Sequence, residues 1–198
     1  MGKLVVTEFV SLDGVFEAPG GGEDFEHAGW TFTFDRGEEG NKFKLDELVA
    51  ADAQLLGRVT YEAFASAWPS MTDDVGFADK MNGMRKYVVS ATLADPTWAN
   101  TEVIRDQVAE QVTALKDRYA GDILVAGSGR LVGSLMECGL VDEFRLMVFP
   151  IVLGSGKRLF ADGTATTRLR LTDCTPIGSD GVTIQTFALA GPAADTAA

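Results

Sequence analysis

The sequence predicts an α/β domain with a mostly parallel central sheet, flanked by helices and closed by an antiparallel hairpin. Three observations support this fold class. Short apolar segments of strand type alternate with segments of helical period along most of the chain. Residues 122–126 are nearly all apolar, as expected for a strand that is buried on both faces. Residues 167–176 and 182–189 alternate in polarity around a Gly-Ser-Asp-Gly turn at 178–181, which predicts a terminal hairpin.

The first half of the chain divides into strands, a loop and helices. Residues 3–10 are apolar and β-branched, and Ser11-Leu12-Asp13-Gly14 follows them, which predicts a strand that ends in a turn. Proline and glycines at 19–22 mark a loop, and an irregular, aromatic-rich stretch extends from there to Gly40. The other elements expected in this half are helices at 42–52 and 60–68 and strands at 53–56 and 86–92.

The second half contains the clearest amphipathic helix. Its apolar residues Val108, Val112, Leu115 and Tyr119 recur at helical spacing, and a glycine follows the helix end. Residues 1–190 are predicted to form a single domain, with a disordered tail of small residues at 191–198. The other elements expected in this half are strands at 103–104, 122–126 and 144–152, a helix at 130–138 and the hairpin.

Composition narrows the possible partners and the compartment. The chain has 198 residues, of which 46% are hydrophobic, enough for a substantial core. Its net charge of −12 repels nucleic acid and anionic membranes, so neither is an expected partner, although a local patch can still bind a small anion. Cys138 and Cys174 are too few for a disulfide framework or a zinc site. Glu8 interrupts the apolar N-terminal run, which does not resemble a signal peptide, so a cytoplasmic location is expected.

Three segments with polar groups are expected at the carboxyl ends of strands, where ligands bind in sheets of this kind. They are Gly57-Arg58-Val59-Thr60, Ser90 with its neighbours, and Gly127-Ser128-Gly129-Arg130. Glycines before a helix would let a phosphate approach the free N–H groups of its first turn, and arginine binds phosphate bidentately. The alternative is that the glycines only relieve turn strain, that Arg58 is a surface ion-pair partner and that Ser90 ends a strand.

Other polar and aromatic residues leave two interpretations open. Asp13 follows the first strand, either as a candidate acid or as ordinary Asp-Gly turn chemistry. Trp30, Phe32 and Phe34 alternate as one face of a strand would, and they could stack on a flat substrate or cover the core. His27 is the only histidine and is expected to be a solvated loop residue, so no metal-ligand set is predicted.

Four motifs, taken together, resemble the dihydrofolate reductase-like superfamily and, within it, the reductase domain of riboflavin biosynthesis. The resemblance extends from about Lys3 to Leu189 and has the form of a stand-alone reductase domain. The motifs are Ser11-Leu12-Asp13-Gly14, Gly57-Arg58-Val59-Thr60-Tyr61-Glu62, Gly127-Ser128-Gly129 and the pair Leu140-Val141-Asp142-Glu143-Phe144 and Pro150-Ile151-Val152-Leu153-Gly154-Ser155-Gly156.

The resemblance implies a mainly parallel sheet with NADPH as cofactor. Where the motifs match, Arg58 would contact the adenosine 2′-phosphate. Thr60, in the same motif as Gly57, would contact the pyrophosphate. Ser90 would lie near the adenosine ribose and its phosphate. The turn formed by Gly127, Ser128, Gly129 and Arg130, with Leu131 nearby, would hold the pyrophosphate against the helix N-terminus. A homodimer, paired through the strand at 144–149 and the C-terminal hairpin, is also implied.

The function implied is the NADPH-dependent reduction of a small heteroaromatic substrate, pterin- or pyrimidine-like. The nearest activity is the 5-amino-6-(5-phosphoribosylamino)uracil reductase step of riboflavin biosynthesis. The acid that protonates the pterin in dihydrofolate reductases would fall near Asn41, so the proton donor stays open, with Asp13 as the candidate. The alternative is a nucleotide-binding or interaction protein on the same scaffold with little catalysis.

Overall fold

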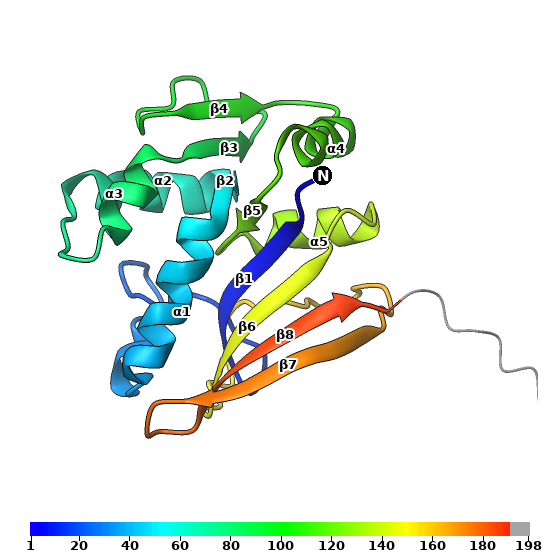
Figure 1. The fold of residues 1–198 in the computed structure, drawn as a ribbon. Coiled ribbons are helices and arrows are strands. Elements are labelled where there is room, and N and C mark those ends of the chain that lie inside the picture. The colour runs from blue at the N-terminus through cyan, green and yellow to red at the C-terminus, as the bar shows by residue number, and fades with distance from the viewer. Residues whose placement is uncertain (191–198) are drawn as a thin grey trace, which may run out of the picture.

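The computed structural model describes residues 1–190, whose strands form one eight-stranded sheet (Figure 1). The sheet order is β4-β3-β2-β5-β1-β6-β8-β7. The six strands from β4 to β6 pair in parallel, whereas β8 pairs antiparallel with β6 and β7. The mostly parallel sheet with an antiparallel C-terminal edge is therefore confirmed. The strands are β1 (Leu4–Ser11), β2 (Ala51–Gly57), β3 (Arg85–Val89), β4 (Thr101–Ile104), β5 (Asp122–Val125), β6 (Glu143–Phe149), β7 (Leu169–Ile177) and β8 (Val182–Leu189).

Helices cover both faces of the sheet, and alternate residues of its central strands enter two different cores. Val6 of β1 packs with residues of α4 and α5, whereas its neighbour Val5 packs with residues of α1, α2 and α3. Both valines are fully buried, which explains why the central strands read as continuous apolar runs. The helices are α1 (Gly37–Ala50), α2 (Arg58–Ala67), α3 (Phe77–Gly83), α4 (Val108–Arg118) and α5 (Gly129–Glu137), with 3-10 turns η1 (Trp30–Thr33) and η2 (Trp68–Ser70).

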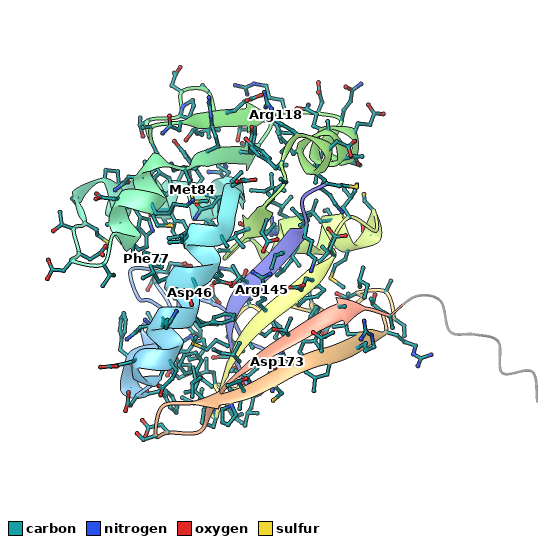
Figure 2. All side chains as sticks on the ribbon, viewed as in Figure 1. Asp46, Phe77, Met84, Arg118, Arg145 and Asp173 are labelled. Carbon is teal, nitrogen blue, oxygen red and sulfur yellow. The ribbon has the colours of Figure 1, made fainter. Side chains whose placement is uncertain are left out.

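Helix α3 was not predicted, because seven residues carry too little periodicity to be recognised. Phe77 begins the helix and Met84 follows its last residue (Figure 2). The Asp73 carboxylate accepts hydrogen bonds from the backbone N–H groups of Phe77 and Ala78, at 3.0 and 2.6 Å. Asp73 therefore binds free N–H groups at the start of the helix.

The aromatic segment is not the strand face that alternation suggested. Residues 30–33 form the 3-10 turn η1 after Gly29, whose φ is +80°. Trp30 is buried and Phe32 is 76% exposed, so the two rings do not share an environment. The rings of Trp30 and Phe34 each make an edge-to-face contact with the Phe149 ring, with centroid distances of 5.3 and 5.5 Å. These two rings therefore cover the core beneath the end of β6.

The ends of the other helices and strands differ from the predicted ends by a few residues. Helix α1 begins five residues before the predicted start and ends at Ala50, because Ala51 already belongs to β2. Glu38 and Glu39 lie in its first turn, where acidic residues favour a helix. Strand β6 ends at Phe149, before Pro150. The tail expected at 191–198 lies outside the described residues. Within residues 1–190, no helix combines the length and apolar character needed to cross a bilayer.

Candidate functional site

The three predicted strand-end segments come together at one edge of the sheet. Strand β2 lies between β3 and β5, and all three run in parallel. The residues that follow them, Gly57 to Thr60, Ser90 and Gly127 to Leu131, therefore share the carboxyl edge. Helices α2 and α5 both begin there, at Arg58 and Gly129. This is the edge at which ligands bind in parallel sheets.

Hydrogen bonds join the turn after β2 to the turn after β5. The Thr60 hydroxyl donates to the Gly127 carbonyl oxygen at 2.8 Å. The Gly57 N–H donates to Ser128 Oγ at 2.9 Å, and the Ser128 hydroxyl donates to the Ala126 carbonyl oxygen at 2.9 Å. Ser128 is buried, so its hydroxyl holds the two turns together. The side chains of Ser128 and Thr60 thus have partners inside the protein.

Both glycines of the turn are required by contacts within the protein. Gly127 has a φ of +61°, and a Cβ there would lie 2.9 Å from Thr60 Cγ2. A Cβ on Gly129 would lie 2.5 Å from Cζ of the Phe16 ring. The sequence left two explanations for these glycines, the approach of a phosphate and the relief of turn strain. The structure supplies a reason that needs no ligand, close packing against Thr60 and Phe16.

Arg58, Arg130 and Leu131 lie in the first turns of α2 and α5. Arg58 is exposed and pairs with Glu62 at 2.9 Å, one helical turn away, so the ion-pair alternative is realised in the structure. Such an exposed pair contributes only about 0.3–0.5 kcal/mol, so a phosphate can compete for the guanidinium. Arg130 is exposed on α5, whereas Leu131 is buried against the core with Phe16.

Ser90 follows β3 and is buried. Its Oγ accepts hydrogen bonds from the backbone N–H groups of Thr92 and Leu93 at 3.2 and 3.0 Å. The side chain therefore shapes the turn after the strand, as the alternative interpretation held. Its hydroxyl proton is still available for a ligand, because both of these bonds use the oxygen as acceptor.

Asp13 joins the turn after β1 to the loop after β6. Its carboxylate accepts hydrogen bonds from the Ser11 hydroxyl at 2.7 Å and from the N–H groups of Leu153 and Gly154 at 3.1 and 2.9 Å. The Ser11 bond, with the two backbone N–H groups, lowers the pKa of Asp13 to about 2. Asp13 is therefore ionised at neutral pH, which suits a positioning role and opposes the role of proton donor.

Glu8 is a candidate residue that sequence reasoning missed. The β1–β5 register ends with Val6 beside Val125, and Glu8, two residues further along β1, lies near the backbone N–H groups of Gly127 and Ser128. Its side chain is buried, and Oε1 has no hydrogen-bond partner among residues 1–190. Burial raises the pKa of Glu8 to about 8, opposed by Lys44 and by the N–H groups of Gly127 and Ser128. The sequence signal was an acidic residue within an apolar strand.

A polar network lies on the α1 face of β1. The Thr7 hydroxyl donates to the Glu47 carboxylate at 2.8 Å, and Lys44 donates to Thr7 Oγ1 at 2.8 Å and to Glu47. Lys44 Nζ lies 5.2 Å from the Phe9 ring centroid, and Arg36 Cζ lies 5.4 Å from it. Two cations over an aromatic ring provide groups that suit a flat, electron-rich or anionic substrate.

A groove lies away from the strand-end segments. It has a volume of about 250 Å³ and lies between α1 and the β7–β8 hairpin. Asp46 of α1 and Asp173 of β7, both labelled in Figure 2, contribute to its lining. It contains none of the predicted site residues. Across residues 1–190, the structure places no group of three or more His, Cys, Asp or Glu side chains where they could hold a metal ion.

Comparisons with known proteins agree with this architecture. The curated Bacillus subtilis (strain 168) protein YyaP, which is uncharacterized, is 28% identical over 190 residues, 92% of this chain and 93% of YyaP. A Shewanella sp. PV-4 protein provisionally assigned to riboflavin biosynthesis has a similar structure, with a TM-score of 0.75, 17% identity, and coverage of 96% of this chain and 99% of that one.

A dihydrofolate reductase from Enterococcus faecalis also shares the fold. Its TM-score is 0.59 at 13% identity, with 96% of this chain and 97% of the reductase covered. The similarity at this level of identity concerns the fold alone, and it confirms a dihydrofolate reductase-like architecture. The model of the RibD C-terminal domain matches residues 2–183. The chain therefore belongs to the RibD C-terminal domain family.

Proposed function

We propose that the protein is an NADPH-dependent reductase of a small heteroaromatic substrate, pterin- or pyrimidine-like. The observation that carries the proposal is the convergence of two helix N-termini, two exposed arginines and the Ser90 hydroxyl at the carboxyl edge of β2, β3 and β5. Membership of the RibD C-terminal domain family supports a reductase. The Enterococcus faecalis dihydrofolate reductase of the same fold was solved with NADP(H).

The groups at this edge fit a phosphorylated dinucleotide. Arg58 would pair with the adenosine 2′-phosphate, and the first turn of α5 with Arg130 would receive the pyrophosphate. Ser90 retains a hydroxyl proton that can be donated to ribose or phosphate. Ser128 and Thr60 would act indirectly, by holding the two turns at their present spacing. NADPH supplies the hydride when bound, and the protein supplies orientation and a path for the proton.

The substrate would lie on the α1 face of β1. The Phe9 ring lies there, with the Lys44 ammonium and the Arg36 guanidinium over it. A heteroaromatic ring with carbonyl oxygens or a phosphate suits the two cations, which can bind its oxygens. Asp13, which is ionised, would hydrogen-bond and position a substrate hydroxyl or N–H group.

The experiment that tests the cofactor assignment replaces Arg58 with alanine. Loss of a charge-assisted phosphate contact costs about 1.5–3 kcal/mol, so NADPH should bind roughly tenfold or more weakly. NADH lacks the 2′-phosphate, so its affinity should change little. Glu62→Ala is the matched control, because it breaks the same ion pair and leaves the guanidinium in place. Titration calorimetry measures the NADPH and NADH affinities of the wild type and both variants, and an equal loss of NADPH and NADH binding in Arg58→Ala would contradict the assignment.

A nucleotide-binding protein with little catalysis is the second candidate. The specific observation that favours it is Asp13, whose carboxylate is engaged by Ser11, Leu153 and Gly154 and holds no proton at neutral pH. Both candidates predict NADPH binding. Only the reductase consumes NADPH when pterin and aminopyrimidine acceptors are offered, which the absorbance of the reduced nicotinamide reports.

A further inference from the structure

One oxygen of the buried Glu8 carboxyl group, Oε1, has no partner within the described residues. The residue belongs to the central strand β1, its side chain is only 5% exposed, and Oε1 lacks a hydrogen-bond partner among residues 1–190. Unpaired buried polar atoms are rare in folded proteins, because the lost hydration is not replaced. A bound ligand that supplies the missing partner would explain why a carboxyl group occupies this position.

The helix N-terminus beside Glu8 favours an anionic ligand. Register with β5 sets Glu8 beside the turn that leads into α5, and the N–H groups of Gly127 and Ser128 act on its carboxyl group. Helix α5 begins at Gly129 and has nine residues, so its N-terminus carries the partial positive charge that attracts phosphate. The unpartnered carboxyl oxygen is thus adjacent to the site proposed for the pyrophosphate.

We propose that Glu8 is a neutral carboxylic acid at the base of the dinucleotide site and donates a hydrogen bond to a pyrophosphate oxygen of the bound cofactor. This inference rests on the proposed function. An ionised Glu8 has no proton to donate and would repel the pyrophosphate, whereas the neutral acid offers a donor where the ligand carries acceptors. Cofactor binding should therefore require a proton on Glu8.

The charged groups around Glu8 agree with a neutral acid at physiological pH. Burial, the dominant cause, raises its pKa to about 8, and Glu47 of α1 acts in the same direction. Lys44 of α1 and the N–H groups of the α5 turn oppose this rise. Lys44 is itself bonded to Thr7 and Glu47 on the α1 face of β1. A bound anion adds further negative charge and would hold the proton more firmly.

The test measures NADPH affinity by titration calorimetry at pH 7 and pH 9 for the wild type, Glu8→Gln and Glu8→Met. If only the protonated form binds, a pKa of about 8 makes the wild-type affinity about tenfold weaker at pH 9 than at pH 7. Glutamine keeps an N–H donor but does not titrate, so its affinity should be the same at both values. Methionine has similar length without a donor, and it should bind roughly tenfold more weakly at both values.

Unfolding of the ligand-free protein supplies an independent measurement. The pKa of Glu8 is raised above 4.5, so its contribution to stability is complete below that pH and is lost as pH rises towards 8. The wild type should lose stability relative to Glu8→Gln across this range in urea titrations. An equal pH dependence of NADPH binding in the wild type and Glu8→Gln would overturn the Glu8 assignment and leave the reductase proposal standing. NADPH that binds the wild type at neither pH would overturn both.

Discussion

Replacing Ser128 with alanine should destabilise the protein by about 1–3 kcal/mol. Ser128 Oγ accepts a hydrogen bond from the Gly57 N–H at 2.9 Å. Within residues 1–190, no other side chain links this N–H to the turn after β5. The residue is 6% exposed, so water cannot readily replace the lost acceptor. Ser128 also precedes α5, but its hydroxyl makes no capping bond to that helix. The expected cost is therefore that of a half-buried backbone N–H that loses its acceptor.

Urea unfolding measures this cost as a lower midpoint at an unchanged slope. For a domain of this size, the same change lowers the melting temperature by roughly 2–12 °C. Ser134→Ala is the matched control, because Ser134 is exposed on α5 and its hydroxyl only donates back to the Arg130 carbonyl oxygen at 3.3 Å. That change should stay within about 0.5 kcal/mol of the wild type.

Two results would refute this reasoning. Equal stability of Ser128→Ala and Ser134→Ala would show that the bond between the two turns contributes little. A tenfold loss of NADPH affinity in folded Ser128→Ala, with stability unchanged, would show that the hydroxyl contacts the ligand directly, as the sequence motif suggested. We expect the affinity to change by less than about threefold, because the hydroxyl is already engaged with Gly57 and Ala126.

Three further predictions concern Lys86, Asp13 and the β7 edge of the sheet. Lys86 is fully buried and donates to three backbone carbonyl oxygens, so Lys86→Met should lower stability by about 2 kcal/mol in urea at pH 7. Burial lowers the pKa of Lys86 to about 8 from 10.5, so the wild type should gain stability between those pH values and the methionine variant should not. Asp13→Asn should be less stable than the wild type at pH 7. The lowered pKa of Asp13 means that its ionised form stabilises the fold, so in thermal melts the difference should vanish as pH falls from about 4 towards 2. A difference that persists at pH 2 would mean that the charge of Asp13 is irrelevant to stability. A homodimer is expected, since β7 is a sheet edge whose residues are largely exposed, and light scattering that finds only the 21.1 kDa species at micromolar concentration would contradict it.

Several features of the fold could be predicted because they depend on short-range patterns. The apolar runs of β1 and β5, the amphipathic period of α4 and the hairpin turn at 178–181 each specify one local conformation. Helix α3 and the 3-10 turn at Trp30 could not be predicted in this way. Both are short, and they are held by contacts with Asp73 and Phe149, which pattern reading does not reveal.

The same distinction between local patterns and long-range contacts applies to the candidate site. The sequence by itself indicated which segments follow parallel strands, and therefore that Gly57, Ser90 and Gly127 would meet at one edge. Only the tertiary structure decided what each side chain does there. Ser128 is bonded to Gly57, 71 residues away in the chain, and Gly129 lies against Phe16. Glu8 faces the turn at Gly127 only through the register of β1 with β5. Periodicity reports which face of an element is buried, whereas strand register and long-range packing determine which residues meet across it.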